Sequence, residues 1–254
     1  MATIASGQRP ALERERGFFL YMALAMAGVI VAGFSVNLAM GRSSFSVPLL
    51  FHVHAFVFFG WVALYVAQNL LVVTGSVALH RRLGWLALLF LPLMVGLGTA
   101  LTVHSLRASG GPPFFDANEF LFGNILGIVA FAGIATAAIM LRRRSDWHRR
   151  LMCCAMATLT GPGFGRLLPM PLLIPWVWWI AAVVTPGLFM LIGIIADRRR
   201  TGRVHGAWLW GFAALAGSQL LADAIAYSPA GLEIVRGVMA GTPGAAAEMR
   251  AHFP

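Results

Sequence analysis

Apolar segments long enough to cross a lipid bilayer follow one another along almost the whole chain, and they limit its fold more than any other feature. A helix needs roughly 20 apolar residues to span a hydrocarbon core of about 30 Å. The alternating strands of about ten residues that form membrane barrels are absent. The sequence therefore predicts an all-α, polytopic transmembrane helical bundle of about seven spans. These spans lie near residues 18–40, 47–74, 84–105, 118–141, 150–168, 172–196 and 206–227.

Composition agrees with an integral membrane protein. Hydrophobic residues make up 59% of the 254 residues and charged residues only 11%, which leaves too little polar surface for a soluble globule. We expect a cytoplasmic N-terminal segment (1–17), a single seven-helix transmembrane domain (18–227) and a short extracytoplasmic tail (228–254). The N-terminal segment is polar and no small-residue cleavage site follows the first span, so we expect no removable signal peptide.

The distribution of arginine predicts the orientation. All 19 basic residues are Arg, and basic residues in short loops concentrate on the cytoplasmic side of a membrane. A cytoplasmic N-terminus places fourteen of them inside and five outside. The net charge of +10 thus reflects topology and does not predict binding to nucleic acid. The inner set is Arg9, Arg14, Arg16, Arg81, Arg82, Arg142, Arg143, Arg144, Arg149, Arg150, Arg198, Arg199, Arg200 and Arg203, and the outer set is Arg42, Arg107, Arg166, Arg236 and Arg250.

The fifth span differs from the others. Its middle reads Thr160-Gly161-Pro162-Gly163, and a proline removes one backbone donor while glycines loosen the helix. We predict a kink or a break there, which can persist at membrane depth when it is buried in protein or lines a cavity. Cys153 and Cys154 are adjacent in the same span, and we expect them to be packing residues because neighbouring cysteines suit neither a disulfide nor a metal site.

The second span carries a polar stripe. His54, Trp61, Tyr65 and Gln68 fall within about 40° of one another at a helical period of about 100° per residue, whereas His52 points to the opposite side. The stripe predicts an inward face. His54 either binds a metal centre inside the bundle or forms a hydrogen bond with a neighbouring helix, since polar side chains in a membrane often have a function.

A histidine beside arginine stands before three of the spans. His80 lies in His80-Arg81-Arg82-Leu83-Gly84, which we interpret as a short basic turn, and His148 and His205 occupy similar positions later in the chain. All three should lie at the cytoplasmic boundary. Neutral imidazole is a common ligand of Zn, Cu and haem iron. Any two of these histidines could be axial ligands of one haem, three could hold Zn or Cu, or all could form interfacial hydrogen bonds.

The seventh span carries an acidic residue near its outer end. An intramembrane carboxylate needs a partner, and Arg166 at the outer end of the fifth span is a candidate partner for Asp223. The sequence leaves two interpretations open, a structural ion pair between Asp223 and Arg166 or a role of these residues in a substrate or proton path.

Several of these motifs resemble an uncharacterised family of predicted bacterial polytopic membrane proteins, over about residues 47–170. That family shows a His and a Gln on one helix, His-Arg-x-x-Gly opening the next helix, and a His-x-x-Met helix start that ends in Arg. The matching residues here are His54 and Gln68, His80 to Gly84, and His148 to Met152 with Arg166 downstream. The resemblance implies a bacterial inner-membrane location and an architecture rather than an activity.

A looser similarity connects the chain to transmembrane di-haem b-type cytochromes. It implies His54 with His104 on one side of the bundle and His80 with His148 on the other. We therefore expect a membrane protein that binds haem b, or else Zn or Cu, through His80 and His148, with His205 and His54 as alternates. It would move electrons between a quinone or small reductant and a partner. The alternative is a non-enzymatic accessory or assembly subunit of a larger membrane complex, or a protein that binds an apolar ligand near Pro162.

Overall fold

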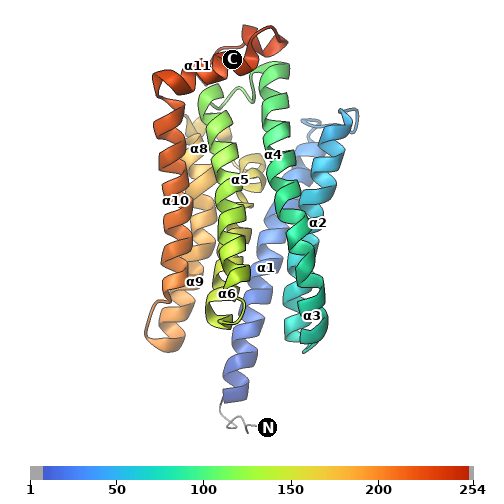
Figure 1. Ribbon diagram of the computed structural model, residues 1–254, viewed down its shortest axis with the longest axis vertical. Coiled ribbons are helices and arrows are strands. Elements are labelled where there is room, and N and C mark those ends of the chain that lie inside the picture. The colour runs from blue at the N-terminus through green and yellow to red at the C-terminus, as the bar shows by residue number, and fades with distance from the viewer. Residues whose placement is uncertain (1–7, 252–254) are drawn as a thin grey trace.

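The computed structural model describes residues 8–251, with side chains from residue 13 onward, and this part of the chain folds into helices and connecting loops without strands (Figure 1). Short 3-10 turns η1 (Gly84–Leu86), η2 (Met170–Leu173) and η4 (Pro243–Ala246) and a π-helical turn η3 (Ile180–Val184) join or extend the α-helices. These α-helices are α1 (Gln8–Ala39), α2 (Leu49–Val73), α3 (Val77–Leu83), α4 (Ala87–Ser109), α5 (Ala117–Met140), α6 (Ser145–Thr158), α7 (Gly161–Leu167), α8 (Val177–Trp179), α9 (Thr185–Thr201), α10 (Gly206–Ala226) and α11 (Pro229–Met239).

Six helical stretches in the described residues are long and apolar enough to cross a membrane. They run side by side along the long axis of the molecule (Figure 1), and large apolar side chains such as Tyr21, Leu88 and Leu220 are exposed on their outer faces. This is the architecture of a multi-pass membrane protein and confirms the predicted all-helical class. The six stretches are Glu13–Ala39, Leu49–Val73, Val77–Ser109, Ala117–Met140, Val177–Thr201 and Gly206–Ala226.

The predicted fifth span is divided in two, as the Gly/Pro sequence indicated. Helix α6 ends at Thr158 and α7 begins at Gly161, so Pro162 stands in the first turn of α7, where its missing N–H costs no helical hydrogen bond. The side chains from Cys153 to Ala157 have no exposure to solvent. Helix α6 therefore lies in the core of the bundle, where it contacts α5, α10, α9 and α1.

Glycines allow the backbones of α1 and α7 to approach each other closely. A Cβ atom on Gly33 would overlap the carbonyl group of Gly163, and one on Gly163 would lie 3.0 Å from the Cα atom of Ile30. A Cβ atom on Gly161 would lie 2.8 Å from the carbonyl oxygen of Ala181. The glycines around Pro162 thus serve close helix packing, and the apolar-ligand cavity expected near Pro162 stays a prediction.

The two ends of the bundle differ in chemistry. One end carries the start of α1, α3 and the loops after α5 and α9, and we call it the arginine-rich end because Arg81, Arg142 and Arg203 lie in these segments. At the opposite end, α11 lies across the bundle (Figure 1) and packs on α4 and α5 through Val235 and Met239. Part of the expected tail is therefore an ordered amphipathic helix.

The predicted basic turn at His80 is wrong, and the predictions for the two ends of the chain lie partly outside the described residues. The segment from His80 to Gly84 is helical and continues through η1 into α4, and the actual turn lies before it at Gly75, whose φ of 80° requires the left-handed region that glycine adopts readily. Residues 1–7 of the expected N-terminal segment and 252–254 of the expected tail lie outside the described residues.

Candidate functional site

Two of the predicted ligand histidines meet at the arginine-rich end. His80 on α3 and His148 in the first turns of α6 have ring centres 6.3 Å apart, with the ring planes at 79°. The Nδ1 atom of His148 donates a hydrogen bond of 2.8 Å to the carbonyl oxygen of Ala138. This bond assigns the proton to Nδ1, so the Nε2 atom of His148 keeps a lone pair that can accept a hydrogen bond or bind a metal.

Buried polar atoms without hydrogen-bond partners lie in this pair and near it. The Nδ1 atom of His80 and both amide atoms of Gln68 on α2 are buried and have no hydrogen-bond partner among the described residues. Gln68 lies next to the start of η1, since a Cβ atom on Gly84 would be 3.9 Å from its Nε2 atom. An unsatisfied buried polar group costs about 1–3 kcal/mol, so a water molecule or a ligand at this place would satisfy these groups.

The predicted polar stripe of α2 does face inward. Trp61 and Tyr65 are 2% and 5% exposed, and Gln68 lies one turn further along the same face. In contrast, His52 is exposed and its Nε2 atom lies 3.2 Å from the carbonyl oxygen of Phe45. The indole nitrogen of Trp61 is buried without a hydrogen-bond partner in the described part of the chain.

The third predicted histidine is engaged elsewhere. The Nδ1 atom of His205 accepts a hydrogen bond of 3.1 Å from the backbone N–H of Ala207 and so caps α10. Its Nε2 atom then carries the proton and donates to Asp146 over 3.0 Å, and this hydrogen bond holds the pKa of Asp146 below its ordinary value. Both ring nitrogens of His205 thus form hydrogen bonds in this structure, and its role as an alternate metal ligand stays a prediction.

The donor set restricts which metal centre could bind. Within residues 8–251 no group of three or more His, Cys, Asp or Glu side chains is arranged to hold a metal ion. Two imidazoles alone are too few for a structural zinc site, which has four protein ligands. They match a haem, whose porphyrin supplies the other four nitrogens, or an ion that also takes the Gln68 oxygen and an exogenous ligand.

A buried ionic network lies at the same end of the bundle. Arg150 on α6 donates two hydrogen bonds to Asp197 on α9, from Nε over 2.7 Å and from Nη2 over 2.8 Å. Their side chains are 5% and 1% exposed. The indole N–H of Trp208 on α10 also donates to Asp197 over 2.7 Å. This bidentate geometry satisfies the planar guanidinium group of Arg150 and ties three helices together.

Glu15 extends the network to α1. Its carboxylate lies 2.8 Å from Arg149 and 3.2 Å from Arg150, while Arg200 contacts both Glu15 at 3.6 Å and Asp197 at 2.7 Å. The sequence predicted a role of these arginines in orientation, but it did not predict their acidic partners Glu15 and Asp197. The available signal was Asp197 itself, a lone carboxylate at the end of an apolar span.

His54 and Arg166 lie toward the opposite end, away from His80. The His54 ring stacks on Phe58 with ring centres 4.0 Å apart, and His104 packs edge-on against Phe51 at 5.6 Å. The two histidines therefore each contact a phenylalanine of α2. Arg166 lies over the Phe34 ring at 4.0 Å and donates to the carbonyl oxygen of Pro162 over 2.8 Å.

The proposed ion pair between Asp223 and Arg166 is not formed. The Asp223 carboxylate instead accepts hydrogen bonds from Trp179 over 2.8 Å and from Gln219 over 2.7 Å. Gln219 in turn accepts one from Trp178 over 2.7 Å. The indole N–H of Trp179 thus binds Asp223 directly, and the indole N–H of Trp178 binds Gln219, which in turn donates to Asp223. The Asp223 carboxylate has these partners without Arg166.

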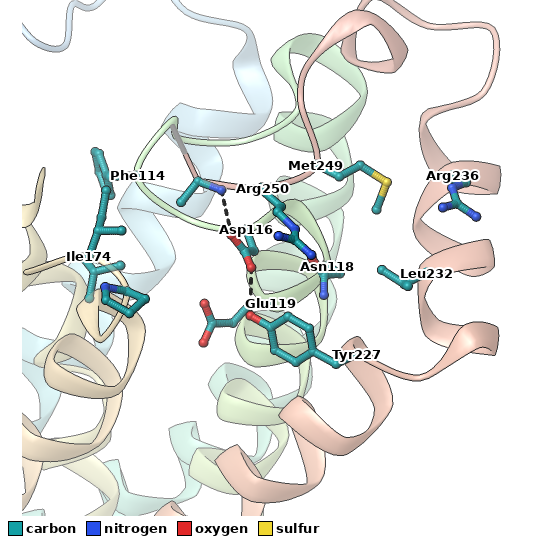
Figure 2. Close-up of a pocket in the computed structure, with 13 residues that line it drawn as sticks. Phe114, Asp116, Asn118, Glu119, Ile174, Tyr227, Leu232, Arg236, Met249 and Arg250 are labelled. Atoms are coloured by element: carbon teal, nitrogen blue, oxygen red, sulfur yellow. Dashed lines mark hydrogen bonds between the residues drawn. The ribbon is translucent and has the colours of Figure 1, made fainter. Parts of the chain in front are cut away.

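A cavity of about 610 Å³ lies at the opposite end of the bundle, among the starts of α5 and α11, the end of α10 and the chain near Ile174 (Figure 2). Asp116 on its wall accepts hydrogen bonds from the Tyr227 hydroxyl over 2.9 Å and the Ala251 N–H over 2.6 Å. Burial and the nearby Glu119 carboxylate raise the pKa of Tyr227, so its hydroxyl stays protonated and donates. No pattern in the sequence predicted this cavity.

Comparisons with protein-family models, with curated proteins and with solved structures found no match for this chain. The resemblance to a bacterial membrane family stays a prediction.

Proposed function

We propose that this protein is an electron-transfer protein of the bacterial inner membrane that binds one transition-metal centre through His80 and His148. Haem b is the form we place first, and copper or zinc is the alternative. The observation that carries the proposal is the meeting of two imidazole rings from separate helices beside polar atoms that lack partners. In this proposal His80 and His148 would each supply one imidazole nitrogen to the metal.

In this proposal the residues around the His80–His148 pair have different roles. The carbonyl oxygen of Ala138 fixes the tautomer and orientation of His148, as hydrogen-bonded neighbours do for metal-binding histidines. Arg81 and Arg82 are exposed one and two residues after His80, so they can pair with carboxylate groups such as haem propionates. Haem iron, when bound, would supply one-electron transfer, and a quinone or small reductant at the membrane would be its electron donor.

The proposed topology has seven crossings with a cytoplasmic N-terminus. Helices α6 and α7 together supply the seventh, because Arg150 near the start of α6 joins the network at the arginine-rich end, whereas Met170, just after α7, packs in a cluster with Phe114 and Phe115 near the opposite cavity. The positive-inside rule places the arginine-rich end, and therefore the His80–His148 pair, in the cytoplasm.

Substitution of the two histidines tests the metal site. We expect His80→Ala and His148→Ala each to remove the bound metal and its visible absorption from purified protein, while the exposed control His52→Ala keeps both. Normal metal content in both variants would refute the assignment. A stable partner that copurifies with all three variants, with no metal in any of them, would instead favour an accessory or assembly subunit.

A further inference from the structure

The cavity opposite the arginine-rich end contains a buried acidic side chain that has no protein partner. Glu119, in the first turn of α5, is 6% exposed and lines this cavity. Its carboxyl group forms no hydrogen bond or ion pair with the described residues. Figure 2 shows this group beside the ring of Tyr227. Because a buried carboxylate is costly without a partner, Glu119 is stabilised in its charged form only when a positive group lies against it.

The neighbouring charged groups leave Glu119 without a cation. Asp116 accepts two hydrogen bonds, and Figure 2 shows Arg250 beside it. Asp223 is likewise held by two side-chain donors. Both carboxylates act electrostatically on Glu119, and Figure 2 shows the other arginine of the wall, Arg236, on α11 and away from Glu119. The surroundings of Glu119 are therefore electronegative, which favours a cationic ligand.

The wall around Glu119 suits an organic ammonium ion. An ammonium group presents three N–H donors to a carboxylate, and the aromatic rings of Phe114 and Tyr227 on the wall can contact its positive charge. Apolar side chains such as Ile174 and Leu232 complete the wall and can cover a carbon skeleton. The described part of the chain has no group of three or more His, Cys, Asp or Glu side chains arranged for a metal ion, so an ammonium ion fits this cavity better than a bare metal ion does.

We propose that this cavity binds a primary amine with an apolar carbon skeleton, whose ammonium group donates hydrogen bonds to the Glu119 carboxylate. The amine can be a solute or the headgroup of an aminophospholipid, because the cavity lies at an end of the transmembrane bundle, where solutes and headgroups both reach. This site is separate from the His80–His148 pair and does not depend on the proposed metal.

A matched amine and alcohol test the proposal. Purified, delipidated protein is titrated by calorimetry with phenethylamine, which is charged at neutral pH, and with phenethyl alcohol, which has a similar skeleton without the charge. We expect saturable binding of the amine and at least tenfold weaker binding of the alcohol, because hydrogen bonds to charged groups are the stronger ones. Displacement of the amine by phosphatidylethanolamine but not by phosphatidylcholine would identify the lipid headgroup as the source, and no displacement by either lipid would identify a solute. Equal affinity for the amine and the alcohol would overturn the proposal.

Variants assign the binding to Glu119. We expect Glu119→Gln to weaken amine binding roughly tenfold or more, since the charge of the acceptor is lost. The exposed control Glu233→Gln on α11 changes the net charge equally and should bind as the wild type does. If Glu119→Gln does not fold, Leu232→Trp provides a second test, because the larger side chain should fill part of the cavity and also weaken binding. Failure of wild-type protein to bind phenethylamine would overturn the proposal, as would wild-type affinity in both Glu119→Gln and Leu232→Trp.

Discussion

The Asp197 carboxylate accepts hydrogen bonds from three side chains, those of Arg150, Arg200 and Trp208. A carboxylate that is only 1% exposed would be strongly unfavourable without such partners, and a buried guanidinium without its carboxylate is equally unfavourable. The network therefore fixes the relative positions of α6, α9 and α10 at the arginine-rich end, close to the proposed metal ligand His148.

Removal of this carboxylate should destabilise the protein strongly. We expect Asp197→Ala to lower the free energy of unfolding by about 3–5 kcal/mol, because it leaves Arg150 buried without its main partner. The exposed Glu13→Ala variant on α1 should change it by less than about 0.5 kcal/mol. Denaturant or thermal unfolding of purified protein in one detergent measures both, and an Asp197→Ala variant as stable as the control would contradict the structural role of the network.

Side-chain partners across the network could not be predicted from the sequence. Asp197 and Arg150 are 47 residues apart, and Glu15 is 135 residues from Arg150. The positive-inside rule already explains an arginine at the end of a transmembrane helix. The position of such an arginine therefore does not predict a carboxylate partner. His205 has the same ambiguity in the sequence, since a histidine before a span can cap the helix as well as bind a metal.

At the scale of elements, local sequence patterns predicted helix faces and helix breaks better than they predicted side-chain partners. The period of His54, Trp61, Tyr65 and Gln68 correctly identified the inward face of α2, and Gly161-Pro162-Gly163 correctly located the break between α6 and α7. The segment at His80 was predicted as a turn and is helical, because its residues have no helix breaker before Gly84 while Gly75 provides the positive φ that a turn needs. A helix break such as the one between α6 and α7 can pack against neighbouring helices or line a cavity. The outcome depends on those helices and cannot be predicted from the local sequence.

The close contact between α1 and α7 gives a test of element packing. We expect Gly163→Ala to destabilise the protein by about 1–3 kcal/mol, since its Cβ atom would press on the backbone of α1 at Val29 and Ile30. Gly28→Ala, on the exposed face of the same α1 helix with nothing within 4 Å of the new atom, should be neutral or slightly stabilising. Equal unfolding temperatures for the two variants would show that this contact is not tight.

At the scale of the whole molecule, the proposed seventh crossing by α6 and α7 can be tested by thiol labelling. Cys153 and Cys154 have no exposure, so they should give little background with a membrane-impermeable maleimide. We expect Leu172→Cys, whose native side chain is 82% exposed, to react in intact cells like the control Ser43→Cys. Arg143→Cys should react only after permeabilisation. Labelling of both Leu172→Cys and Arg143→Cys from the same side would contradict a crossing by α6 and α7.

The metal content of wild-type protein tests the central proposal most directly. The protein is purified from membranes without added metal, and its visible spectrum and its iron, copper and zinc content are measured against protein concentration. The pairing of His80 with His148 predicts about one metal per chain, with a Soret band if the centre is haem. Protein that folds as a stable helical bundle but contains neither a Soret band nor stoichiometric iron, copper or zinc would contradict it.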